Sequence, residues 1–122
     1  MSKKERFPGY AACLAMMRKH DPSIQEAGFH ALLPHAAEHV DALIQEFLTE
    51  RDHGLRCWLL ELIGEARSPK SLTLLIDELC SPDDSMRDWA ARGLTVLNTH
   101  EARKALGESG WARAPRAAPA SS

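Results

Sequence analysis

Residues 52–66 read DHGLRCWLLELIGEA, and residues 83–97, 31 positions further on, read DDSMRDWAARGLTVL. A third copy of the pattern, DPSIQEAGFHALLPH, starts at Asp21, again 31 positions before Asp52. Each copy opens on an aspartate and carries apolar residues in the same columns. Self-similarity at a fixed period is the signature of a repeat architecture. The sequence therefore predicts a tandem-repeat protein.

The apolar residues within each copy recur every three or four positions, as Leu55, Leu59 and Leu62 do. This spacing is typical of one face of a helix and not of a strand. A second apolar stretch follows each copy in the same register, so each unit is predicted to be a pair of helices, in which Leu60 faces inward and Glu61 faces solvent. The spacing predicts helices at about 9–19, 22–34, 37–51, 54–66, 70–80, 84–98 and 100–107.

The repeat resembles a known family. Residues 86–97, MRDWAARGLTVL, follow an order of aliphatic residue, arginine, two variable residues, two small residues and a later leucine. This order resembles the first helix of a short HEAT-like repeat of the type named after phycobilisome lyases. The stretch from Leu55 fits with larger residues, and the stretch from Ile24 has Gln25 for the arginine and Leu33 for a glycine. The resemblance implies an armadillo-like fold and says little about activity, because the motif residues are packing residues.

The predicted fold is thus all-α, a right-handed α-α superhelix of about seven helices. A HEAT-like domain over residues 1–110 is expected to contain a half repeat at 8–20 and repeats at 21–51, 52–82 and 83–107. Residues 111–122 are rich in Ala, Pro and Ser and are predicted to form a disordered tail, with Trp111 folding over the last helix.

Composition favours a soluble cytoplasmic domain. The chain has 122 residues, of which 44% are hydrophobic and 26% charged, and no apolar run approaches the ~18 residues of a membrane span. The Lys-rich start is followed at once by Phe7, Pro8 and Gly9, which is not a signal peptide. The three cysteines are odd in number and form no C-x-x-C pair, so reduced thiols are expected.

The charge distribution argues against a nucleic-acid partner. The net charge is −2, with basic ends and an acidic middle. A solenoid that binds phosphates should carry Lys and Arg along its inner face, because each phosphate needs a cation. Here that face is expected to carry Glu38, Asp41 and Glu46.

Residues 35–39 read HAAEH, which matches the H-x-x-E-H pattern of a family of zinc peptidases. The repeat register argues against a zinc site, because it assigns His35 to the end of one helix and His39 to the next. We therefore expect His35 at the edge of the core, His39 in solvent, and no metal, cofactor or catalytic residue.

The second helices carry the residues that we predict to bind a partner. Leu72 and Ile76 replace polar residues of the preceding unit, which favours an apolar floor between acidic and basic rims. The alternative is a rolled helix that buries both side chains. The predicted surface comprises Asp41, Gln45, Glu46, Leu72, Thr73, Ile76, Asp77, Arg103 and Lys104.

Trp58 and Trp89 share a column of the repeat. They are possible aromatic anchors for a partner, or they stack between successive first helices.

The sequence taken alone favours a non-catalytic scaffold or adaptor of bacterial type that binds a protein partner through its concave face. It leaves three alternatives open: an immunity protein that neutralises a toxin, a chromophore-lyase-like subunit, and a nucleic-acid-binding HEAT-like protein.

Overall fold

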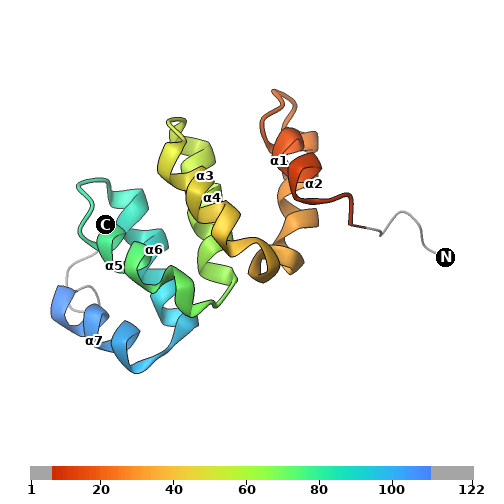
Figure 1. Ribbon diagram of the computed structural model, residues 1–122. Helices are drawn as coiled ribbons and strands as arrows, with labels where there is room; N and C mark the ends of the chain where they lie inside the picture. The colour runs from red at the N-terminus through yellow and green to blue at the C-terminus, as the bar shows by residue number, and fades with distance from the viewer. Residues whose placement is uncertain (1–6, 111–122) are drawn as a thin grey trace.

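The computed structural model describes residues 7–110, and these residues form helices and turns without a strand. The prediction of an all-α solenoid-like fold is confirmed (Figure 1). The α-helices and two 3-10 segments are α1 Tyr10–Met17, α2 Pro22–Leu32, η2 Leu33–His39, α3 Val40–Thr49, α4 His53–Glu65, η3 Pro69–Ser71, α5 Leu72–Leu79, α6 Asp84–Leu97 and α7 His100–Ser109.

The repeated aspartates are helix N-caps. The side chain of Asp21 accepts from the backbone N–H of Ser23, and that of Asp52 accepts from Leu55. Asp83 accepts from both Ser85 and Met86. An N-cap carboxylate satisfies backbone donors that have no partner within the helix, and it also favours the positive end of the helix dipole. The period of 31 residues therefore marks the start of every first helix.

A second repeated position, four residues after each aspartate, links consecutive helices. Gln25 donates from Nε2 to the carbonyl oxygen of Lys19 at 2.6 Å, just beyond α1. Arg56 donates from Nη1 to the carbonyl oxygens of Phe47 and Glu50 at the end of α3, both at 3.0 Å. Arg87 donates to the carbonyl oxygen of Ser81 at 2.6 Å. These side chains satisfy carbonyl groups that the end of a helix leaves unpaired.

The first helices α4 and α6 cross glycine against glycine. A Cβ atom built on Gly64 would lie 2.9 Å from the Cα atom of Gly93. Fully buried leucines on the second helices, such as Leu43 and Leu75, close the core beneath this layer. The absence of side chains at the crossing lets the two backbones touch.

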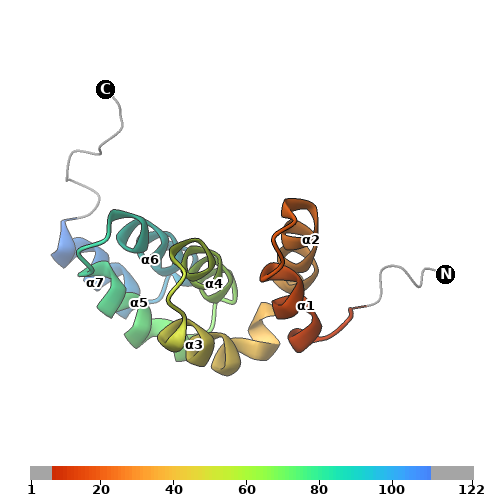
Figure 2. The same cartoon turned by 90° about the horizontal axis from the view of Figure 1, so that it is seen from above.

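The first junction departs from this regular stack. Figure 2 shows α2 standing away from α4, whereas α4 and α6 lie side by side. The positions that correspond to Gly64 and Gly93, one repeat earlier, are Leu33 and Leu62. Because leucine side chains occupy space that the glycines leave empty, the close crossing cannot form there. Instead α2 packs on α1, where a Cβ on Gly28 would lie 2.7 Å from the carbonyl oxygen of Cys13.

The segment η2 corrects one expectation from the sequence. His35 and His39 were predicted on different helices, but both lie in this one 3-10 segment. Pro34 has no N–H for an α-helical hydrogen bond, which favours the tighter turn. His39 is half-buried and not in solvent, because its ring stacks on Tyr10 at 5.3 Å. The ring of His35 stacks on Phe7 at 3.9 Å.

Two expectations lie outside the described residues: the packing of Trp111 and the disordered tail at 111–122. Within residues 7–110, none of the helices has the length and apolar character needed to cross a membrane.

Candidate functional site

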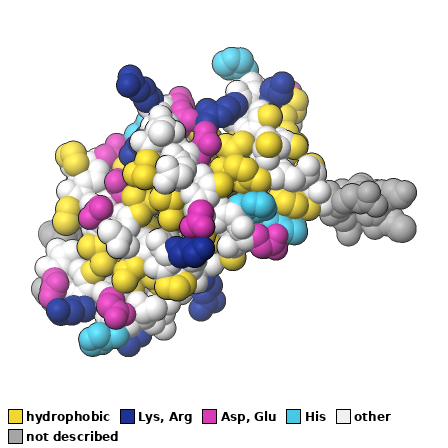
Figure 3. Space-filling model, viewed as in Figure 1, with side chains coloured by type: hydrophobic (Ala, Val, Ile, Leu, Met, Phe, Trp, Pro, Cys, Tyr) yellow, Lys and Arg dark blue, Asp and Glu magenta, His cyan; other side chains and the backbone are white. Residues whose placement is uncertain are grey.

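The second helices place the predicted partner surface on the side viewed in Figure 1. Figure 3 shows hydrophobic side chains gathered over α3 and α5 on this side. Leu72 and Ile76 are half-buried and pack against the core, while Thr73 and Asp77 are exposed. These two side chains are therefore neither fully exposed, as an open apolar floor requires, nor fully buried, as a rolled helix requires. Leu48 of α3, which the sequence reasoning missed, is 57% exposed, although its repeat counterpart Leu79 is buried.

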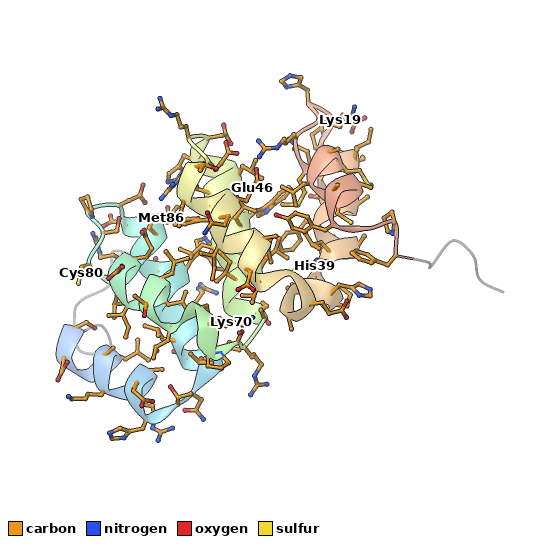
Figure 4. The ribbon with its side chains drawn as sticks, viewed as in Figure 1. Lys19, His39, Glu46, Lys70, Cys80 and Met86 are labelled. Carbon is orange, nitrogen blue, oxygen red and sulfur yellow. The ribbon has the colours of Figure 1, made fainter. Side chains whose placement is uncertain are left out.

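Four of the five charged residues of this surface have partners within the chain. Asp41 accepts from Nζ of Lys70 at 3.1 Å, and Glu46 pairs with Arg18 of α1. Figure 4 shows Glu46 on the flank of α3 that faces α1. Arg103 donates to the carbonyl oxygen of Asn98 at 2.8 Å. Gln45 is exposed, and Lys104 lies 3.7 Å from the carboxylate of Glu108. Exposed pairs of this kind contribute little, about 0–1 kcal/mol each.

The two tryptophans have different surroundings. The indole of Trp58 stacks on the ring of Phe29 in α2, with centroids 5.2 Å apart. The indole of Trp89 lies beneath the guanidinium of Arg92, 5.1 Å from its centroid. Both indoles are half-buried and keep part of their surface open to solvent.

A hollow of about 360 Å³ lies between the first helices α4 and α6. Pockets for small molecules typically measure about 300–1,000 Å³, so the hollow can hold a small ligand or part of a larger one. Above the glycine crossing its walls are mixed, with an aromatic, an aliphatic, a cationic and two acidic side chains. It is lined by Glu61, Gly64, Glu65, Trp89, Arg92, Gly93, Thr95 and Val96.

Glu61 is the unusual ionisable group of this hollow. The sequence register predicted that it faces solvent, but its side chain is half-buried. Burial raises the pKa of the Glu61 carboxyl, and repulsion from Glu65 adds to the rise, while Arg92 and His30 oppose it. The register missed this because it locates the core of one unit and not the contact between neighbouring units. The sequence feature that pointed to this contact is that Glu61 and Arg92, which have opposite charges, occupy the same position in consecutive repeats.

A second cleft, of about 260 Å³, opens at the irregular junction between the α1–α2 pair and α4. Its polar groups are already engaged, because Gln25 donates to Lys19 and Asp52 caps α4. The cleft is lined by Met17, Gln25, Asp52, Gly54, Leu55 and Trp58.

The thiols and histidines form no further centre. Burial raises the pKa of the Cys13 and Cys57 thiols, which keeps both protonated near neutral pH. In the H-x-x-E-H stretch, Nδ1 of His35 lies 3.4 Å from a carboxylate oxygen of Glu38. Over the described part of the chain, no group of three or more His, Cys, Asp or Glu side chains is arranged to hold a metal ion.

Comparison with known proteins identifies one similar sequence. The chain is 31% identical over 80 residues to the bilin biosynthesis protein RpcF of Synechococcus sp. (strain WH8020). The similarity covers 65% of this chain and 38% of the relative, so the chain spans well under half of the relative's length. No protein-family pattern and no solved structure matches. This similarity gives the lyase-type repeat resemblance partial support.

The similarity contradicts the prediction of a non-catalytic adaptor. The relative is named for a biosynthetic role, which agrees better with the chromophore-lyase-like alternative than with a scaffold or with the absence of enzymatic activity. The sequence reasoning missed this because the repeat motif consists of packing residues, and packing residues carry no sign of chemistry.

Proposed function

We propose that this chain is a chromophore-lyase-like protein that handles a bilin, an open-chain tetrapyrrole, on behalf of a protein partner. The observation that carries the proposal is the 31% identity to a bilin biosynthesis protein over 80 residues. The similar stretch is long enough to include more than two repeat units.

The chemistry of a bilin sets the requirements for its site. Its conjugated rings offer flat apolar faces, its pyrrole groups offer N–H donors, and its two propionate side chains are anionic. A suitable site therefore needs an aromatic wall, a hydrogen-bond acceptor and a cation. The first-helix side of this protein supplies these groups in Trp89, Glu61 and Arg92, which line one hollow.

The reaction in this class would join the bilin to a cysteine of the partner. The thiol adds across an exocyclic carbon–carbon double bond, so a carbon–sulfur bond forms and the thiol proton ends on the neighbouring carbon, without an oxidant or reductant. The attacking species is the thiolate. Burial raises the pKa of the Cys13 and Cys57 thiols, which disfavours their thiolates, and the proposal assigns the acceptor sulfur to the partner. The exposed Cys80 is tested separately by the Cys80→Ser variant below.

The partner's place in this proposal is the second-helix side. Half-buried Leu72 and Ile76 on α5 and exposed Leu48 on α3 give this side apolar side chains, and exposed Asp41 and Asp77 lie on the same two helices. Interfaces commonly combine such an apolar centre with a polar rim. Because the bilin is proposed to lie on the first-helix side, the partner's reactive cysteine must extend around the edge of the domain to reach it.

The direct test is binding of biliverdin to the purified chain. Biliverdin has no fixed handedness in water, so a bound molecule should gain circular dichroism in its visible absorption bands. We expect a saturable signal that disappears when the protein is unfolded in urea. The Cys80→Ser variant, which removes the exposed thiol, should bind equally well. Absence of any visible dichroism with the folded protein in large excess would refute the proposed function.

A further inference from the structure

Resting on the proposed function, we infer that the hollow between α4 and α6 is the bilin subsite. Trp89 forms its stacking wall, Glu61 accepts the pyrrole N–H groups, and Arg92 binds a propionate. The hollow lies entirely on the first-helix side, and three of its side chains match three different parts of one ligand.

The shape of the hollow follows from the glycine crossing. Gly64 and Gly93 bring α4 and α6 together without side chains between them, so the space above the crossing is left open. Trp89 and Val96 of α6 wall this space. Both are half-buried, and Trp89 packs against the core. At about 360 Å³ the hollow covers part of a tetrapyrrole and leaves the remainder accessible to a partner's thiol.

The aromatic wall suits a flat conjugated ligand. The Trp89 indole is half-buried and packs against the core, and the Arg92 guanidinium lies 5.1 Å from the ring centroid. Arginine binds carboxylates through two parallel N–H groups, and such charge-assisted bonds are stronger than neutral ones. Arg92 is exposed, so its guanidinium can turn from the indole to a propionate with little loss.

The carboxylate of Glu61 completes the match. Its side chain is half-buried and lines the hollow. Its carboxyl oxygens are hydrogen-bond acceptors that a ligand N–H in the hollow can use. The pyrrole N–H groups of a bilin are donors of this kind. Burial and the neighbouring Glu65 raise the pKa of the Glu61 carboxyl, while Arg92 and His30 oppose the rise.

The cleft at the first junction is a weaker candidate for the same ligand. Its lining contains Trp58 and Leu55 but no Lys or Arg to pair with a propionate. Its two polar side chains, Gln25 and Asp52, already donate and accept within the chain. The hollow and the cleft therefore differ in one group. The hollow has Arg92 to bind a propionate of the ligand, and the lining of the cleft has no cationic side chain.

That difference can be tested with biliverdin and its dimethyl ester, whose propionates are uncharged. Arg92→Gln should weaken biliverdin binding about tenfold and leave the ester nearly unaffected, because only the acid form offers a carboxylate to the guanidinium. Glu61→Gln should weaken both ligands to a similar extent, since both keep their pyrrole N–H groups. The matched controls are Arg103→Gln on α7 and Trp58→Leu in the cleft, and neither should change the affinity for either ligand.

The outcomes separate the site from the function. If the wild type binds biliverdin but Arg92→Gln weakens acid and ester equally, or neither, the assignment of the hollow is wrong while the proposed function stands. Loss of binding in Trp58→Leu with Trp89→Leu unaffected would move the site to the cleft and also overturn the inference. Far-UV circular dichroism of each variant checks that its helices are intact. If the wild type binds neither ligand, the proposed function itself fails.

Discussion

The glycine crossing between α4 and α6 makes the substitution Gly64→Ala a sharp test of the packing. The added Cβ atom would lie 2.9 Å from the Cα atom of Gly93 and 3.5 Å from its nitrogen. Contacts of 3.4–4 Å are ordinary, and the atom in the way is backbone, which cannot rotate aside. The two helices must therefore move apart along their whole contact.

The expected cost follows from two opposing effects. Overpacking a well-filled core typically costs about 1–3 kcal/mol. Replacing glycine by alanine inside a helix returns about 1 kcal/mol. The net expectation for Gly64→Ala is a loss of about 0–2 kcal/mol. Gly107 of α7 provides the matched control, because no atom lies within 4 Å of a Cβ built there. Gly107→Ala should therefore gain about 0.5 kcal/mol from helix propensity alone.

Urea denaturation followed by far-UV circular dichroism measures both variants against the wild type. The two variants should differ by about 1.5 kcal/mol, which corresponds to roughly 6–12 °C in melting temperature for a domain of this size. Equal stability of Gly64→Ala and Gly107→Ala would refute the glycine-to-glycine crossing and the origin of the hollow above it.

Two further predictions concern stability. Leu60→Ala, at a side chain with no exposed surface, should cost about 2–5 kcal/mol in chemical denaturation, whereas Thr73→Ala at an exposed position should change little. The pKa of Glu50 is lowered, first by the backbone N–H of Asp52 and then by Arg18, so Glu50 stabilises the fold above its unfolded pKa and this contribution is lost as pH falls through the folded pKa. Glu50→Gln should thus be less stable than the wild type at pH 7 and equal to it in acid, in urea titrations across that range; a deficit that persists unchanged in acid would contradict the charge-based explanation.

The sequence by itself determined the repeat and the starting points of the first helices, whereas α3 and α5 begin two or three residues later than predicted, after the 3-10 segments η2 and η3. Asp21, Asp52 and Asp83 cap helices by accepting hydrogen bonds from residues only two or three positions away. Interactions this local can be predicted from the spacing of residues in the sequence. The same holds for the inward residues, because a helix of period 3.6 assigns each position to a face. The repeated Gln25, Arg56 and Arg87 were also visible, but their bonds to the end of the preceding helix required the folded chain.

Only the tertiary structure decided how neighbouring units meet. Periodicity locates the core of one unit, whereas the distance between units depends on side-chain volume at the crossing, which is glycine at Gly64 and leucine at the matching Leu33. The close crossing creates the hollow and half-buries Glu61, which the register placed in solvent. The wide junction opens the second cleft instead. A candidate site built between units therefore follows from packing that the repeat pattern does not encode.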